Sequence, residues 1–209
     1  MDLVEAALAW YDAGFCILPA GPKKMVALPS WKEFQTARPL RSEVQAWAER
    51  HEGIGMICGE VSGHAEMLEI EASAAHLLTP FLSAVGAESQ ALLAKLMTYV
   101  EVSARGGYHW IYRVEGGVGG NTKLAGSATH ETWIETRGEG GWTVLAPSGG
   151  RVSPEGGKWK VAEGRPGVVA VMTAEQRDTL HRIARTFDEA PAVVVEPVSY
   201  THLTLPTKA

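Results

Sequence analysis

The middle of the chain carries the stretch Met67-Leu68-Glu69-Ile70-Glu71, in which apolar and acidic residues alternate. Successive side chains of a β-strand point to opposite faces, so Leu68 and Ile70 would face the core while Glu69 and Glu71 share the other face. These two carboxylates would stand roughly 6–7 Å apart at a rise of ~3.3 Å per residue. They repel unless solvent or a cation screens them, and hard divalent cations prefer oxygen ligands. The stretch therefore predicts a strand with either a cation site or a solvated acidic face.

A second acidic segment, Trp133-Ile134-Glu135-Thr136-Arg137, has the same alternation. Glu135 and Arg137 would point the same way, and a surface ion pair of this kind contributes little to stability. The alternative is that Glu135 is a third carboxylate beside Glu69 and Glu71. Three carboxylates on adjacent strands can bind two metal ions, which would activate an attacking hydroxyl and stabilise a leaving pyrophosphate.

Between the acidic segments lies Ser103-Ala104-Arg105-Gly106-Gly107-Tyr108-His109-Trp110-Ile111-Tyr112-Arg113. The two glycines would let backbone N–H groups approach a phosphate closely. Arg105, His109 and Arg113 supply positive or hydrogen-bond donor groups. A plain hairpin turn followed by a strand with a structural histidine would explain the same residues.

The remaining pattern predicts an α+β domain around a largely antiparallel sheet. Helices are expected at 3–13, 43–52, 74–85, 88–97 and 174–188, with the third bent or broken by Pro80. Strands are expected at 15–19, 53–59, 66–72, 98–103, 108–114, 133–136, 142–146, 151–152, 159–161 and 168–172, with 151–152 and 159–161 forming a last hairpin. Helices that precede strands linked by tight glycine turns are typical of this class.

The composition excludes several classes of protein. The chain has 209 residues, of which 45% are apolar and 21% charged, so it is neither disordered nor fibrous. It has no apolar run of roughly 18 residues and no basic, apolar N-terminal leader, so we expect no membrane partner and no secretion. The net charge is −5, so any nucleic acid would be held weakly, through a local patch, or with help from another domain.

Taken in order, these motifs resemble the N-terminal domain of the bifunctional primase/polymerase (Prim-Pol) family, within the archaeo-eukaryotic primase superfamily. The resemblance covers about residues 3–165 and is strongest to phage and actinobacterial members. Its elements are the start at 8–19, Lys23-Lys24, the segments 31–36 and 53–59, the acidic pair at 68–71, the glycine turn at 103–109 and the segment 134–151. This family has a compact primase-type α+β fold.

The resemblance implies template-directed nucleotidyl transfer from nucleoside triphosphates on single-stranded DNA, in phage, plasmid or bacterial DNA replication. In the family, three acidic residues bind two divalent ions, Mg²⁺ or Mn²⁺, and these positions match Glu69, Glu71 and Glu135. The motif histidine, which contacts the phosphates of the incoming nucleotide, matches His109, so these four residues are the implied catalytic set. The nucleotide-binding residues implied here are Ser103, Arg105, Gly106, Gly107, His109, Arg137, Lys23, Lys24 and Lys32. No zinc is expected, because the chain has only two cysteines.

We expect a primase/polymerase catalytic domain at 1–172, a C-terminal helix at 173–189, and a linker with a non-native tail at 190–209. The last residues resemble a translated sequencing adapter, so the natural protein is expected to continue differently. The sequence has no Gly-x-x-x-x-Gly-Lys-Ser/Thr loop, so a helicase domain or protein outside this chain is a possible partner. The resemblance places the protein in the cytoplasm of a bacterial or phage-infected cell.

Two departures and two alternatives accompany this interpretation. Many relatives have Asp at one or more metal positions, whereas this chain has Glu at all three, and Ala72-Ser73-Ala74 replaces a Gly-rich or acidic turn.

A degenerate domain could bind nucleotide or single-stranded DNA without chemistry. A glycosidase could use Glu71 and Glu135 as an acid/base pair. Trp142 and Trp159 are candidates either for base stacking or for hairpin packing.

Overall fold

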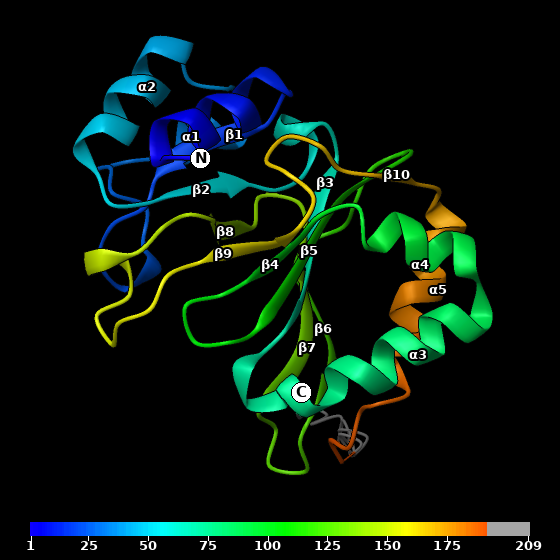
Figure 1. The fold of residues 1–209 in the computed structure, drawn as a ribbon. Coiled ribbons are helices and arrows are strands. Elements are labelled where there is room, and N and C mark those ends of the chain that lie inside the picture. Colours follow the sequence, from blue (N-terminus) through cyan, green and yellow to red (C-terminus); the bar gives the residue numbers. More distant parts are fainter. Residues whose placement is uncertain (192–209) are drawn as a thin grey trace, which may run out of the picture.

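The computed structural model describes residues 1–191, so nearly all of the linker and tail expected at 190–209 lies outside the described residues. The helices are α1 (Leu3–Asp12), α2 (Arg41–Arg50), α3 (Leu78–Glu88), α4 (Gln90–Leu96) and α5 (Ala174–Arg185) (Figure 1). The strands are β1 (Cys16–Pro19), β2 (Ile54–Ile57), β3 (Ala65–Ile70), β4 (Val100–Val102), β5 (Tyr108–Val114), β6 (Thr122–Gly126), β7 (Thr132–Arg137), β8 (Trp142–Leu145), β9 (Lys160–Glu163) and β10 (Val171–Met172).

The strands form two sheets. A three-stranded antiparallel sheet has the order β1-β2-β8, and a larger sheet has the order β6-β7-β3-β5-β4-β9, with β10 added parallel to β5. The paired strands on the main path of the larger sheet all run antiparallel. The expected α+β fold with a mainly antiparallel sheet is therefore confirmed.

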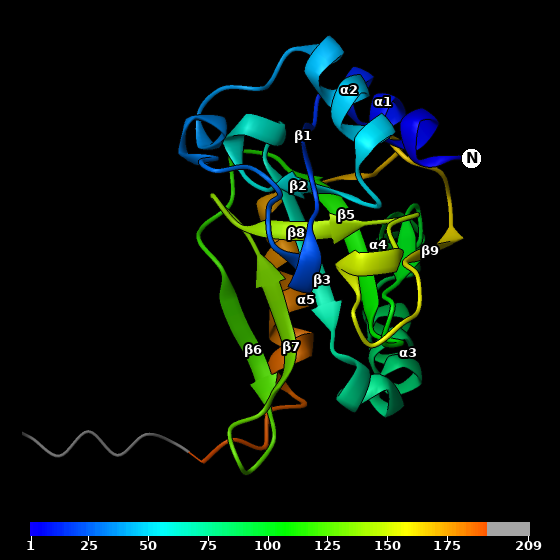
Figure 2. The ribbon, with the colours of Figure 1, turned by 90° about the vertical axis from the view of Figure 1, so that its left-hand side faces the viewer.

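Helices α3, α4 and α5 cover one face of the larger sheet, while α1 and α2 lie against the small sheet (Figures 1 and 2). Under α3 to α5, Leu68 and Ile70 of β3 pack in one apolar core with Phe81, Trp110 and Leu180. A second apolar core joins α1, α2 and the small sheet to the opposite face of β3 and β5. The burial of both faces explains why every residue of β3 is buried.

Along β3, the apolar contacts of the second core end at Met67. Met67 packs in that core, whereas Glu69, two residues further along the same face, lies beyond it and is only 7% exposed. The solvated acidic face that the alternation allowed is therefore wrong for Glu69. A buried carboxylate needs compensation from hydrogen bonds or opposite charge.

Glu66, the second residue of β3, anchors helix α5 to the face of the sheet that α3 to α5 cover. Glu66 is completely buried, accepts two-pronged hydrogen bonds from Arg177 of α5, and accepts a 2.8 Å hydrogen bond from the Tyr112 hydroxyl. Burial raises the pKa of Glu66, but the interactions with His181 and Arg177 outweigh burial and leave that pKa below its usual value. Helix α5 is thus part of the same packed body as the sheet.

Three elements differ from the expectation. Pro80 does not break a helix, because α3 begins at Leu78, and Pro80 sits in the first turn, where a missing N–H has no partner to lose. Residues 151–152 are part of a 3₁₀ turn, and β9 pairs with β4, so the hairpin expected between 151–152 and 159–161 is wrong. Strand β6 was not expected, because its sequence, TKLAG, has weak strand propensity and gains its place by pairing with β7.

No helix among residues 1–191 is long and apolar enough to cross a membrane.

Candidate active site

The register of the larger sheet brings the predicted acidic residues together. Glu69 of β3 lies directly opposite Glu135 of β7 on one side and opposite His109 of β5 on the other. Directly paired residues point to the same face of a sheet. These three side chains therefore form one row on the face opposite α3 to α5, and Glu71 follows just beyond the end of β3.

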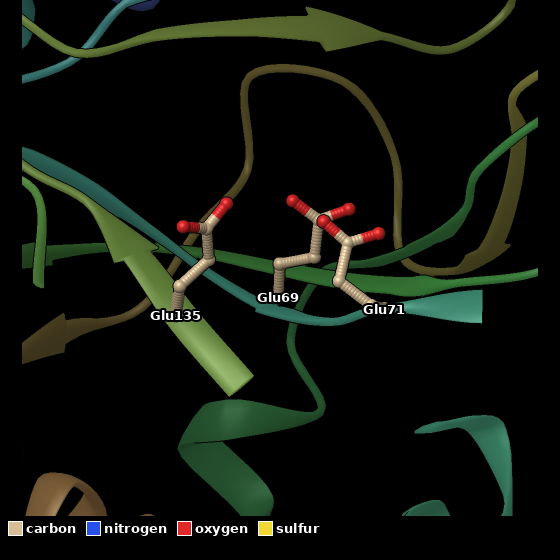
Figure 3. A group of neighbouring side chains, drawn as sticks. All are labelled: Glu69, Glu71 and Glu135. Carbon is tan, nitrogen blue, oxygen red and sulfur yellow. The ribbon is translucent and has the colours of Figure 1, made fainter. Parts of the chain in front are cut away.

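The side chains of Glu69, Glu71 and Glu135, here called the three-glutamate cluster, rise from the sheet in the same direction (Figure 3). One carboxylate oxygen from each lies within 4.8 Å of the other two. Burial raises the pKa of Glu71, and the charges of Glu69 and Glu135 raise it further. Burial also raises the pKa of Glu135, against the lowering effect of Arg137, which pairs with it.

A divalent cation fits this cluster. Carboxylate oxygens are the ligands that hard cations prefer, and burial together with the neighbouring carboxylates raises the pKa of Glu71 and of Glu135, so added positive charge would be favourable there. The structure therefore supplies both the donor atoms and an electrostatic reason to bind an ion.

His109 is a second cationic group beside this cluster, in addition to Arg137. Its Nε2 lies 3.1 Å from Oε1 of Glu69, and its side chain is 5% exposed. Burial lowers the pKa of His109, but Glu69 and Glu101 outweigh burial and raise that pKa to about 10. The imidazolium in turn lowers the pKa of Glu69, against the effect of its burial. At neutral pH the row therefore contains an imidazolium beside carboxylates.

A cavity of about 410 Å³ opens over this row. This volume is within the range of about 300–1,000 Å³ usual for small-molecule sites. Its walls combine two acidic residues, three basic side chains, the polar side chains of Asn121 and Thr143, and three indole rings. The lining residues are Lys24, Trp31, Met67, Glu69, Glu71, His109, Asn121, Arg137, Gly140, Gly141, Trp142, Thr143, Val144 and Trp159.

The backbone of the loop that holds Lys24 is strained. Lys23 and Lys24 both have left-handed backbones, with φ of 57° and 62°, which costs roughly 1–3 kcal/mol for each non-glycine residue. The Trp142 indole donates a 2.7 Å hydrogen bond to the Lys24 carbonyl, and the Lys24 ammonium lies 5.6 Å from the ring centre of Trp159. The strained loop thus holds a positive charge at the wall of the cavity.

The two candidate stacking residues differ in exposure. Trp159 is 1% exposed and packs with Val144 and Val152, so a base has little of its ring to stack on. Trp142 is partly exposed and lines the cavity, and Trp31 does the same. Of the two expected platforms, Trp159 serves packing, and Trp142 is open to a ligand.

The glycine turn differs from the expectation in detail. The Gly107 amide donates to the Ser103 hydroxyl at 3.0 Å, and the Gly106 amide donates to the Ser103 carbonyl at 2.9 Å. Both amides are therefore used inside the turn, and neither is free for a phosphate in this conformation. Gly107 is needed because a Cβ there would lie 2.8 Å from the Ile70 carbonyl oxygen. Phosphate binding by Ser103, Gly106 and Gly107 stays a prediction.

The remaining residues expected to contact the nucleotide lie at three separate cavities. Lys24 and Arg137 line the cavity together with Glu69 and Glu71. Arg105 is exposed, pairs with Glu155 at 3.3 Å and lines a separate cavity with Lys23 and Lys24. Lys32 borders a further depression beside Trp31.

Sequence analysis did not identify three features of the site. Asn121 lines the cavity from the turn before β6, a strand that was not expected. Trp31 was noted only as part of a family motif. Glu101, which lies next to His109 on β4, was hidden in a short apolar strand.

A comparison with known protein families finds one match. The family described as bifunctional DNA primase/polymerase, N-terminal, matches residues 7–174, which is most of the chain. The chain belongs to the Prim-Pol family. The matched range contains the three-glutamate cluster, His109 and the strained lysine loop, and it ends at the first residue of α5. No curated protein matches the chain.

Membership of the Prim-Pol family gives the general activity. Prim-Pol domains are nucleotidyltransferases that act on nucleotides and DNA and generally use divalent metals. A cluster of three carboxylates, with one oxygen of each within 4.8 Å of the others, agrees with that chemistry. The glycosidase alternative does not agree with the family.

Proposed function

We propose that the chain is a template-directed DNA primase/polymerase that extends a strand from nucleoside triphosphates at the three-glutamate cluster. The observation that carries the proposal is the single row of Glu135, Glu69 and His109 on adjacent strands, with Glu71 beside it, under a cavity of about 410 Å³. In the cell it would act in the replication of phage, plasmid or bacterial DNA.

In the proposed reaction, a 3′-hydroxyl attacks the α-phosphate of the bound triphosphate. The new bond joins the 3′ oxygen to the α-phosphorus, and the bond from that phosphorus to the pyrophosphate oxygen breaks. Two divalent ions, Mg²⁺ or Mn²⁺, held by Glu69, Glu71 and Glu135, would lower the pKa of the hydroxyl and stabilise the departing charge.

The residues of the chain would hold the triphosphate in place. Nε2 of the His109 imidazolium faces Oε1 of Glu69 at the cavity, and its single N–H would pass from Glu69 to a phosphate oxygen when Glu69 binds a metal ion. Lys24 and Arg137 add positive charge from two sides of the same cavity. Charge-assisted donors of this kind bind anionic groups more strongly than neutral donors do. The partly exposed ring of Trp142 is available to a base or sugar.

The test is a primer-extension and de novo priming assay on single-stranded DNA with labelled nucleotides. It would compare Mg²⁺, Mn²⁺ and EDTA, using the wild type, the Glu69→Gln/Glu71→Gln double variant and a control, Glu49→Gln, on the exposed face of α2. We expect metal-dependent product with the wild type and the control and none with the double variant. Product from a folded double variant would refute the site.

The alternative is a degenerate domain that binds nucleotide without chemistry. It predicts metal-dependent triphosphate binding by the wild type with no incorporation in either assay. A binder gains nothing from three clustered carboxylates beside a phosphate, and this argues for the enzyme.

A further inference from the structure

The row of site residues extends one strand further, to a residue with no role assigned so far. Glu101 of β4 lies directly opposite His109 of β5, so the order across four adjacent strands is Glu101, His109, Glu69, Glu135. Glu101 is completely buried. It lies behind His109, on the side away from Glu69.

The two oxygens of the Glu101 carboxylate have different surroundings. Oε1 accepts hydrogen bonds from the Tyr99 hydroxyl and from the Ala146 amide, the latter at 2.9 Å. Oε2 has no hydrogen-bond partner within the part of the chain that the structure describes, and neither has Nδ1 of His109. These two atoms face each other at 3.8 Å.

An unpartnered charged atom in the interior is costly, and here two complementary ones are adjacent. A hydrogen bond from a cationic ring nitrogen to a carboxylate has a length of about 2.7–2.9 Å, so an approach of about 1 Å completes it. The hydrogen bonds from Ala146 and Tyr99 to Oε1 hold the Glu101 carboxylate in place, and Oε2 is left to orient the imidazole ring of His109.

We propose that Glu101 is a positioning residue that accepts a hydrogen bond from Nδ1 of His109 and thereby aims Nε2 into the cavity, toward the triphosphate. The part that concerns the triphosphate rests on the proposed function. Glu101 touches neither the cavity nor the three-glutamate cluster, and it acts through His109 alone. Because Ala146 follows β8, Glu101 also ties the small sheet to the larger sheet behind the site.

The principal variant is Glu101→Gln. The amide has one acceptor, and two donors, Tyr99 and Ala146, hold it in place, so its NH₂ would face Nδ1 and the hydrogen bond to His109 would be lost. Glu101→Met, with no acceptor at all, is a second variant of similar size. Tyr99→Phe is the matched control, because it removes a partner of Glu101 but leaves Oε2 in place.

The first readout is the imidazole proton spectrum of His109, which does not depend on activity. We expect the wild type to show a downfield, exchange-protected Nδ1 proton that is absent from His109→Ala and from both Glu101 variants, and present in Tyr99→Phe. A wild type without such a proton overturns the proposal even if no Glu101 variant folds.

The second readout is the affinity for dATP with Mn²⁺, measured by calorimetry. Loss of a charge-assisted hydrogen bond should weaken dATP binding by about ten-fold or more in Glu101→Gln and leave Tyr99→Phe within about two-fold of the wild type. The double variant Glu101→Gln/His109→Ala should bind dATP no more weakly than His109→Ala does, because the two changes remove the same interaction. The proposal would be overturned if folded Glu101→Gln bound dATP with wild-type affinity. It would also be overturned if the losses of affinity in Glu101→Gln and His109→Ala multiplied in the double variant.

The two proposals fail in different ways. A wild type that binds dATP with this coupling but extends no primer refutes the polymerase and keeps the role of Glu101. Primer extension that needs the three-glutamate cluster, with an unchanged KM in Glu101→Gln, keeps the polymerase and refutes the role of Glu101.

Discussion

Replacement of Glu71 by Gln should stabilise the metal-free protein. Glu71 is the member of the cluster best suited to this test, because within residues 1–191 its carboxylate accepts no hydrogen bond, whereas Glu69 is paired with His109 and Glu135 with Arg137. Glu71→Gln therefore removes repulsion and little else.

The size of the effect follows from the distances. Two full charges at the 4.8 Å limit repel by about 3.5 kcal/mol in an effective dielectric constant of about 20. Nearby cations and solvent offset much of this, which leaves about 1–2 kcal/mol. For a chain of this size, Tm in EDTA should then rise by about 2–8 °C at pH 7.

The same variant should respond less to metal. A saturating ion at 100 times its Kd stabilises the folded protein by about 2.7 kcal/mol, so Mn²⁺ should raise the Tm of the wild type well above its value in EDTA. Glu71→Gln, with one ligand fewer, should gain less. The difference in Tm between Glu71→Gln and the wild type should therefore shrink in Mn²⁺ or change sign. Glu49→Gln should follow the wild type in both buffers.

The pH dependence of the stability difference tests whether the charge of Glu71 is its cause. The pKa of Glu71 is raised in the folded state, so the folded protein binds this proton more tightly than the unfolded chain does. Its unfavourable effect is therefore absent well below the usual carboxyl pKa of about 4.5 and complete once the pH has risen above the folded-state pKa. Thermal unfolding in EDTA should show the two proteins converging at low pH. A Glu71→Gln variant that is less stable than the wild type in EDTA at pH 7, or a wild type that does not respond to Mn²⁺, would refute the reasoning.

Three further predictions concern the surroundings of the site. Arg177→Met should destabilise the protein by about 3–5 kcal/mol in urea unfolding, because it takes the guanidinium away from the buried Glu66 and leaves that carboxylate only Tyr112 and His181. Adding Glu66→Gln should recover part of the loss, and a loss below about 1 kcal/mol would contradict the prediction. Gly107→Ala should lower Tm and disturb the end of β3, because the new Cβ would lie 2.8 Å from the Ile70 carbonyl oxygen; an unchanged Tm would show that the turn relaxes freely. Finally, the pKa of His109 is raised to about 10, so its contribution to stability is complete below about pH 6.5 and is lost as the pH rises through 10. Urea unfolding in EDTA from pH 6 to 10 should show this loss in the wild type and a flatter profile in His109→Gln.

The strands that carry the site were predictable because their signals are local. Alternation in Met67–Glu71 and in Trp133–Arg137 identified β3 and β7, and both pair as expected of an antiparallel sheet. The hairpin expected at 151–161 was wrong for the opposite reason. Its two glycines and one proline mark turns, but β9 pairs with β4, more than fifty residues earlier in the chain, and local pattern carries no information about that partner.

Glu101 shows the same limit inside the site. It was within an expected strand, yet a single acidic residue between apolar neighbours gave no reason to assign it a function. Only the pairing of β4 with β5 places it behind His109. The glycine turn is a further case, since spacing suggested free amides and the fold uses both within the turn.

By itself, the sequence determined the α+β class, the strands that carry Glu69, Glu71 and Glu135, and the family, because periodicity and motif order are properties of neighbouring residues. The tertiary structure decided which charges meet. It set the register that aligns Glu101, His109, Glu69 and Glu135 across four strands, and it removed Glu69 from solvent. Register and burial depend on contacts between residues far apart in the chain, and the pKa of each group in the row depends on both.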